Sequence, residues 1–246
     1  MRVLIGTAAW NEHQKIVRQS ERVLAFMASQ PESEGVTYRY LVVDDGSTDG
    51  SPEALAAMPG VEILRHGENR GAGASVRSIY RRALELQCDV AVTIAGNGKD
   101  DPAQIPDLLR PIREDSCDFV QGSRYLKTES MGTMPRYRLY ATRYVHPVAF
   151  SLAAGRRVTD STNGFRAVRT ALFSDARIAL DQAWLDRYEL EVYLFYKAVV
   201  LGYRVTEVPV RKIYPPREQG YTKMRPLVDW WRMLAPLALL RLGLRS

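Results

Sequence analysis

The chain has 246 residues, of which 46% are hydrophobic and 25% are charged, and its formal net charge at pH 7 is +6. This length fits one α/β domain, alone or with a short appendage, and allows a large buried core. The basic balance indicates an anionic partner, such as phosphate groups or a membrane surface. The sequence has no run of Lys and Arg interleaved with aromatic residues, so we do not expect nucleic acid to be the partner.

Cysteine, histidine and hydropathy patterns exclude several other classes of protein. Cys88 and Cys117 lie in apolar segments without partners at metal-ligand spacing, so we expect buried, reduced thiols of a cytosolic protein. The three histidines are scattered and do not form the pattern of a zinc site. Residues 1–6 resemble a strand rather than a signal peptide, and no stretch reaches the roughly 18 apolar residues of a membrane span. We therefore expect a soluble protein of the cytoplasm, or one bound peripherally at the inner face of the cell membrane.

Apolar runs rich in β-branched residues alternate with segments of helical period, which predicts an α/β fold with a mostly parallel sheet covered by helices on both faces. Strands are predicted at 2–8, 38–44, 61–65, 89–95, 118–122 and 203–210. Helices are predicted at 12–29, 51–58, 72–87, 103–113, 136–154 and 184–201. Loops that could close over a ligand are expected at 123–135 and 211–225.

The last segment, Arg225 to Arg241, has apolar residues at helical spacing, including Trp230 and Trp231. Two interpretations stay open: a helix docked on the domain, or an interfacial helix on an anionic membrane, since tryptophan and arginine suit the headgroup level. We therefore divide the chain into a domain at 1–225 and an amphipathic tail at 226–246.

Polar side chains follow the ends of several predicted strands. The second strand runs directly into Asp44 and Asp45, and Glu12 follows the first strand. The carboxyl ends of parallel strands form the edge where an open α/β sheet binds ligands. The glycine-rich helix start at 69–73 offers free backbone amides to a phosphate. Taken singly, each signal is also compatible with a solvated turn or a first-turn carboxylate of a helix.

In this order, the motifs resemble the nucleotide-sugar-dependent glycosyltransferases of family 2, which have the GT-A fold, and most closely the dolichyl-phosphate mannose synthase type. The resemblance extends over residues 3 to 225. It is carried by AWNE at 9–12, VVDDGSTDGS at 42–51, ENRGAG at 68–73, GSR at 122–124, DSTNGFR at 160–166 and GYTKM at 220–224. It implies donor contacts at Thr7, Ala9, Glu12, Asp44, Asp45 and Arg70.

The sequence departs from this family after the fourth strand. Relatives carry a D-x-D motif there that ligates Mg²⁺ or Mn²⁺, whereas this chain has Ala95 and Asn97, followed by Lys99. We hypothesise that the Lys99 ammonium does part of the metal's electrostatic work, with Asn97 beside the nucleotide sugar. Alternatively, a shifted loop presents Asp100 and Asp101 with Asn97 as metal ligands, or both aspartates are helix-start carboxylates.

The resemblance places an acceptor phosphate among cationic residues, although the segment 125–137 fits the family poorly. The implied contacts are Arg124, Arg138, Arg217 and Lys223. A phosphate acceptor is already ionised and needs cations for positioning, whereas a hydroxyl acceptor needs a carboxylate base.

Candidates for such a base lie in two segments. Asp160 is the first candidate for a sugar contact or general base, with turn capping as its structural alternative. Asp186, Glu189 and Glu191 lie near the start of the predicted helix 184–201, where inverting relatives supply a base, and we select Glu189. Glu189 and Glu191 cannot share one helical face, so at most one points into the cleft.

These observations predict an inverting hexosyltransferase that uses a nucleotide-diphosphate sugar. The favoured acceptor is a polyprenyl phosphate or another lipid phosphate at the membrane face. One alternative keeps the transfer but uses a soluble hydroxyl acceptor, either a glycan or a small metabolite. The other is a nucleotide-binding scaffold without catalysis, which the missing D-x-D carboxylates motivate.

Overall fold

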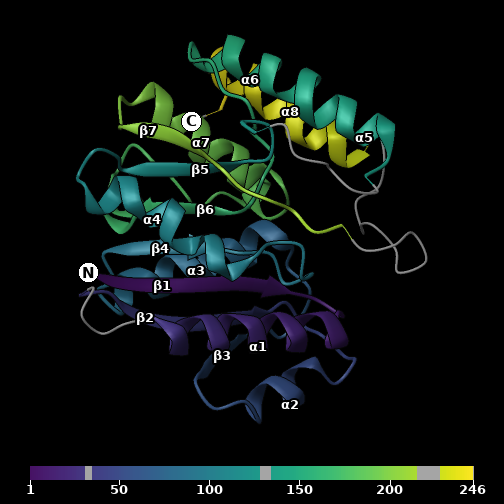
Figure 1. Ribbon diagram of the computed structural model, residues 1–246. Helices are drawn as coiled ribbons and strands as arrows, with labels where there is room; N and C mark the ends of the chain where they lie inside the picture. The colour runs from purple at the N-terminus through teal and green to yellow at the C-terminus, as the bar shows by residue number, and fades with distance from the viewer. Residues whose placement is uncertain (31–34, 128–133, 215–227, 246) are drawn as a thin grey trace.

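The computed structural model describes residues 1–30, 35–127, 134–214 and 228–245. A seven-stranded sheet of order β3-β2-β1-β4-β6-β5-β7 runs through the molecule (Figure 1). All neighbouring strands are parallel except at β6, which is antiparallel to both β4 and β5. The strands are β1 (Arg2–Ala9), β2 (Thr37–Asp44), β3 (Val61–Arg65), β4 (Val90–Thr93), β5 (Phe119–Ser123), β6 (Arg166–Arg169) and β7 (Val205–Pro209).

Helices cover both faces of this sheet, as predicted, because alternate strand residues point to opposite sides. On β1, Leu4 belongs to one buried core, whereas Val3 and Ile5 belong to the other. The helices are α1 (His13–Ser29), α2 (Ser51–Ala56), α3 (Ala72–Glu85), α4 (Ile105–Arg113), α5 (Arg136–Tyr140), α6 (His146–Ala154), α7 (Glu189–Val200) and α8 (Val228–Arg241).

Three local differences from the prediction shape the ligand edge. The short strand β6 was not predicted, because the segment was interpreted as a turn. The predicted helix 136–154 is divided into α5 and α6 by the π-helix η3 (Ala141–Val145). The predicted helix 184–201 begins only at Glu189, after a short 3-10 turn η5 (Ala183–Leu185).

The C-terminal helix α8 is docked on the domain. It contacts α6 and α7, and Leu237 and Leu240 are buried against them. Figure 1 shows α5, α6 and α8 together at the end of the molecule opposite α2. Among the described residues, none of the helices is both long and apolar enough to cross a membrane. Cys88 and Cys117 are buried free thiols, as expected.

Candidate active site

A cleft of about 780 Å³ opens beyond the carboxyl ends of β1 and β4. These two strands are neighbours, and the chain leaves them toward opposite halves of the sheet, which makes this the switch point where α/β sheets bind ligands. The predicted site residues that line the cleft are Ala9, Glu12, Asp45, Asn97, Lys99 and Arg138. Lys15 and Arg187 also line it, and the sequence analysis did not select either.

The two adjacent aspartates after β2 have different roles. Asp45 lines the cleft, accepts hydrogen bonds from the backbone N–H groups of Arg70 (3.0 Å) and Gly71 (2.8 Å), and lies 2.8 Å from His66 Nδ1. Asp44 is fully buried away from the cleft, where it accepts a hydrogen bond from the Ser47 N–H (3.2 Å). Asp44 therefore stabilises the turn, and Asp45 ties that turn to the start of α3.

Several backbone N–H groups at the start of α3, where the sequence predicts amides free for a phosphate, already have partners within the protein. Asp45 occupies the Arg70 and Gly71 N–H groups, and the Ala74 N–H donates to the Asp186 carbonyl at 3.0 Å. A Cβ on Gly73 would clash with the Leu185 carbonyl oxygen. These glycines are thus required for close backbone packing against 185–187. The Arg70 side chain is exposed and does not line the cleft.

Residues at the end of β1 contribute one wall. Ala9, Trp10 and Glu12 line the cleft, and Glu12 Oε1 lies 3.7 Å from Lys15 Nζ one helical turn later. Thr7 is fully buried beneath this wall, where its hydroxyl accepts a hydrogen bond from Tyr40 at 3.3 Å. Thr7 supports the wall rather than forming its surface.

The segment after β4 turns its carboxylates away from the cleft. Buried Asp100 accepts a hydrogen bond from the Ala95 N–H at 3.0 Å, and its other oxygen lies 2.9 Å from Lys212 Nζ. Asp101 caps the 3-10 helix η2 (Pro102–Gln104) and lies 3.3 Å from Arg22. Neither aspartate lines the cleft, so their predicted role as replacement metal ligands does not fit this geometry. The alternative of a helix-start carboxylate fits Asp101.

Lys99 is the cation that this segment brings to the cleft. Its side chain is largely buried, and Nζ lies 5.6 Å from the centroid of the Tyr214 ring. The pKa of Lys99 is lowered to about 8, chiefly by burial and in addition by the nearby cations Arg138 and Lys212. Asn97 also lines the cleft, and its side-chain oxygen accepts a hydrogen bond from the Lys99 N–H at 3.2 Å.

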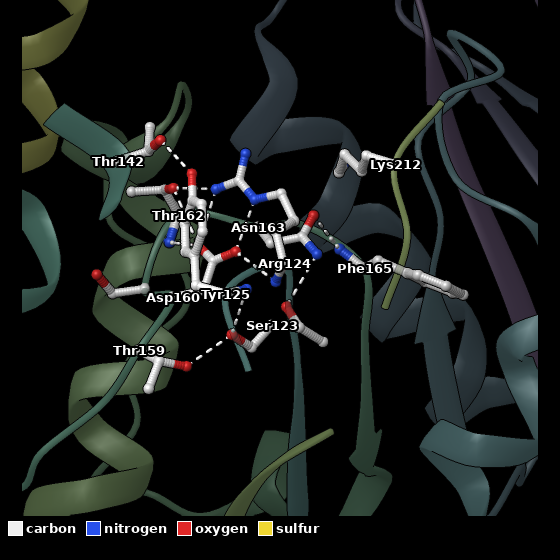
Figure 2. Close-up of polar contacts among 12 residues, drawn as sticks. Ser123, Arg124, Tyr125, Thr142, Thr159, Asp160, Thr162, Asn163, Phe165 and Lys212 are labelled. Atoms are coloured by element: carbon white, nitrogen blue, oxygen red, sulfur yellow. Dashed lines mark hydrogen bonds and ion pairs between the residues drawn. The ribbon is translucent and has the colours of Figure 1, made fainter. Parts of the chain in front are cut away.

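Arg124 and Asp160 bind each other instead of facing the cleft (Figure 2). Arg124 Nε and Nη2 donate to the two Asp160 oxygens at 2.6 and 2.8 Å, and Nη2 also donates to Thr162 Oγ1 at 2.6 Å. Burial acts to raise the pKa of Asp160, but the adjacent Arg124 guanidinium holds that pKa below its usual value. An enclosed, ion-paired carboxylate is unsuited to accept a proton from a substrate. The predicted role of Asp160 as general base therefore does not fit.

The start of α7 places Glu191, not Glu189, in the cleft. Glu191 lines the cleft, and a Cβ on Gly164 would come within 2.7 Å of Glu191 Oε1. Glu189 is buried outside the cleft, and burial raises its pKa. The selected Glu189 therefore lies outside the cleft, and Glu191, the neighbouring candidate, lines it.

A second, smaller cavity of about 50 Å³ adjoins the cleft. Arg138, Thr162 and Met233 line both cavities. The small cavity is also lined by Arg124, another predicted acceptor contact, and has apolar walls from Ala141, Val145 and Leu234. Arg138 on α5 thus stands between the large cleft and the small, mainly apolar pocket. Arg217 and Lys223, the other predicted acceptor contacts, lie outside the described residues.

Comparison with known proteins now identifies the family. Residues 5–176 match the family model described as Glycosyl transferase family 2. The chain belongs to glycosyl transferase family 2. This match includes β1, the aspartates after β2, the segment 95–101 and the Arg124–Asp160 pair, which confirms the resemblance drawn from the sequence motifs.

Two relatives of this family 2 glycosyltransferase have names that specify lipid-phosphate chemistry. The undecaprenyl-phosphate mannosyltransferase of Micrococcus luteus is 30% identical over 228 residues, which cover 91% of this chain and 88% of the relative. The UDP-N-acetylglucosamine–dolichyl-phosphate N-acetylglucosaminyltransferase of Methanococcus voltae is 26% identical over 221 residues. The match covers 82% of this chain and 85% of the relative.

A solved structure supports the GT-A fold. Glucosyl-3-phosphoglycerate synthase from Mycobacterium tuberculosis, crystallised with Mn²⁺, UDP and glucosyl-3-phosphoglycerate, superposes with a TM-score of 0.61. Its sequence is 16% identical, and the match covers 100% of this chain and 81% of the synthase. This likeness confirms the predicted GT-A fold, whereas the family match and the two relatives confirm the predicted glycosyltransferase activity.

Proposed function

We propose that this glycosyltransferase moves a sugar from a nucleoside-diphosphate sugar to a lipid phosphate of the polyprenyl type, with inversion at the anomeric carbon. The observation that carries the proposal is the position of Arg138 between the large cleft and the small apolar pocket. The named chemistry of the Micrococcus luteus and Methanococcus voltae relatives supports the same acceptor class.

The two cavities suit the two substrates of this reaction. A volume of about 780 Å³ is within the range of roughly 300–1,000 Å³ typical of small-molecule sites, and it suits the donor. Arg138 can hold an ionised acceptor phosphate, while Ala141, Val145 and Leu234 contact the first carbons of its lipid chain. A phosphate oxygen then attacks the anomeric carbon from the face opposite the donor diphosphate. The bond from that carbon to the β-phosphate oxygen breaks, and the nucleoside diphosphate leaves.

An exposed apolar face beside the small pocket supports delivery of the acceptor from a membrane. Large apolar side chains recur every three or four residues along α5, η3 and α6 and point outward: Tyr137, Tyr140, Tyr144, Val148 and Leu152. Trp231 on the neighbouring α8 is also 70% exposed. Tyrosine and tryptophan suit the headgroup level of a bilayer, and exposed Arg136 offers charge to anionic lipids. We call this set, from Tyr137 to Leu152, the outer face and propose that it rests on the membrane.

A matched pair of arginine variants tests the acceptor proposal. The purified enzyme is incubated with labelled nucleotide sugars and undecaprenyl phosphate, and the lipid-linked product is quantified. We expect Arg138→Met to lower kcat/KM for the lipid phosphate roughly 10- to 100-fold, because a charge-assisted contact is lost. Exposed Arg18→Met on α1, outside both cavities and the outer face, serves as the control. Absence of lipid-linked product with every donor would refute the proposal.

A hydroxyl acceptor is the second candidate, because Glu191 places a carboxylate in the cleft. If a hydroxyl is the acceptor, Glu191→Gln should lower kcat roughly 10²- to 10⁴-fold by removing the base. If a lipid phosphate is the acceptor, no base is needed and Glu191→Gln should retain most activity. Glu189→Gln, two residues away and outside the cleft, is the matched control.

A further inference from the structure

Among the described residues, the segment after β4 presents no carboxylate to the cleft as a ligand for Mg²⁺ or Mn²⁺. Both ions bind through carboxylate and carbonyl oxygens. After β4, the chain presents to the cleft a methyl group at Ala95, an amide at Asn97 and an ammonium at Lys99. Among the residues that the structure describes, no three His, Cys, Asp or Glu side chains lie close enough together to hold an ion. A cationic side chain at this place would further repel a metal.

The neighbouring segment cannot shift easily to supply carboxylates instead. Its backbone is tied to α1, since Gln19 Nε2 and Arg22 Nη1 both donate to the Asp100 carbonyl at 3.2 Å. On the other side, the Lys99 carbonyl accepts a hydrogen bond from the Ile213 N–H at 2.8 Å. Bringing Asp100 into the cleft would break these bonds together with its contact to Lys212.

The remaining carboxylates of the cleft contact other groups of the protein. Asp45 accepts backbone hydrogen bonds at the start of α3, and Glu12 lies beside Lys15. Glu191 stands against Gly164. The cleft wall around Lys99 is instead cationic, with Lys15 and Arg138 as further members.

We infer that this enzyme binds the diphosphate of its donor without a divalent cation, and that the Lys99 ammonium supplies the positive charge that stabilises the leaving nucleoside diphosphate. The inference rests on the proposed function, because it assumes a nucleoside-diphosphate donor in the cleft. The Tyr214 ring and the anchored backbone fix the position of Lys99 before the donor arrives. In this largely buried setting the ammonium charge is weakly screened by solvent. Its attraction to the β-phosphate therefore strengthens as negative charge grows there.

The test measures nucleotide binding by calorimetry rather than turnover alone. The probes are UDP, GDP, ADP and CDP with their monophosphates, each in excess EDTA and again with Mn²⁺. We expect the wild type in EDTA to bind one diphosphate at least roughly tenfold more tightly than its monophosphate. Addition of Mn²⁺ should change this ratio less than about threefold.

Three variants assign the effect to Lys99. We expect Lys99→Met to lose the preference for the diphosphate and Lys99→Arg to retain most of it. Lys197→Met on α7 removes the same charge outside the cleft and should behave as wild type. In the triple variant Ala95→Asp/Asn97→Asp/Lys99→Gln, binding of the diphosphate should become dependent on Mn²⁺. Circular dichroism of each variant checks that the fold is retained.

Two results would overturn the inference while leaving the proposed function intact. One is diphosphate binding by the wild type only when Mn²⁺ is present. The other is an unchanged diphosphate preference in folded Lys99→Met. Failure of every nucleotide to bind in both conditions would instead refute the proposed function, and this inference with it.

Discussion

At the scale of single residues, the Arg124–Asp160 pair is a structural unit whose members depend on each other. Both side chains are buried, and the guanidinium and carboxylate share two short hydrogen bonds. We predict that Asp160→Asn destabilises the protein by about 3–5 kcal/mol, because Arg124 keeps a buried charge without its counterion. Urea unfolding measures the loss. Asp107→Asn, which breaks an exposed pair with Arg110, should cost no more than about 1 kcal/mol; similar losses in both variants would contradict the prediction.

His146 links the stability of the fold to pH. It is buried between Ser161 Oγ (2.7 Å) and the Met233 carbonyl (3.2 Å), and burial lowers its pKa to about 4. The unfolded chain has a histidine pKa near 6.5, so between about pH 6.5 and 4 the unfolded state binds a proton that the folded state does not. Stability contributed by the neutral imidazole is therefore complete above pH 6.5 and lost as the pH falls.

This difference predicts a loss of about 2 kcal/mol in the free energy of unfolding between pH 7 and pH 5 from His146 alone. Urea titrations of the wild type at the two pH values measure the total change. His146→Gln, which can keep both hydrogen bonds, should show a change smaller by about that amount. An identical pH dependence in the variant would show that His146 does not control it.

At the scale of elements, sequence patterns located the helices and strands that have a strong hydrophobic period. They missed a strand that contacts distant in sequence stabilise. The parallel strands were predicted from apolar runs rich in β-branched residues, and β7 from its alternating pattern. The strand β6 has only four residues and begins with Arg166, which is fully buried. Arg166 lies over the rings of Phe119 and Phe195 and donates to the Glu191 carbonyl. Such partners are distant in sequence, so no local pattern reveals them.

The candidate site shows the same division. The ligand edge and its motif residues could be predicted, because strand ends and turns have local signals. Which carboxylate faces the cleft could not be predicted, since it depends on how α7 packs against the rest of the domain. The sequence alone also could not show that Asp160 is paired with Arg124. Nor could it show that the Ala74 N–H donates a hydrogen bond to the Asp186 carbonyl.

The crossing between α3 and the segment 185–187 gives a prediction at the scale of elements. Gly73→Ala should destabilise the protein by about 1–3 kcal/mol, because the new methyl group meets the Leu185 carbonyl and must push the two segments apart. Nucleotide binding should weaken as well, since Gly71, Ala72 and Arg187 line the cleft. Gly67→Ala is the control, because a Cβ there meets no atom within 4 Å. If Gly73→Ala and Gly67→Ala gave the same unfolding free energy and the same nucleotide affinity, the prediction would be contradicted.

At the scale of the whole molecule, the cleft lies between two parts of the fold. The ends of β1 and β4 line it on one side, and residues of α5, α7 and α8 line it on the other, whereas the outer face lies on α5, η3 and α6 at the end opposite α2. The sequence analysis left open whether 226–246 docks on the domain or lies on a membrane. In the structure, α8 uses Leu237 and Leu240 to pack against α6 and α7, which leaves the apolar stripe of α5 to α6 as the larger exposed surface.

The outer face therefore predicts reversible binding to anionic membranes. We expect the wild type to float with vesicles of phosphatidylglycerol and phosphatidylcholine, and less with phosphatidylcholine alone, because the net charge is +6. The triple variant Tyr140→Ser/Val148→Ser/Leu152→Ser should lower partitioning at least roughly tenfold, since three exposed apolar side chains no longer enter the bilayer. Val200→Ser, which alters an exposed apolar residue of α7, should float as the wild type does. Equal flotation of the triple variant and the wild type would show that another surface contacts the membrane, with the exposed Trp231 of α8 as the next to substitute.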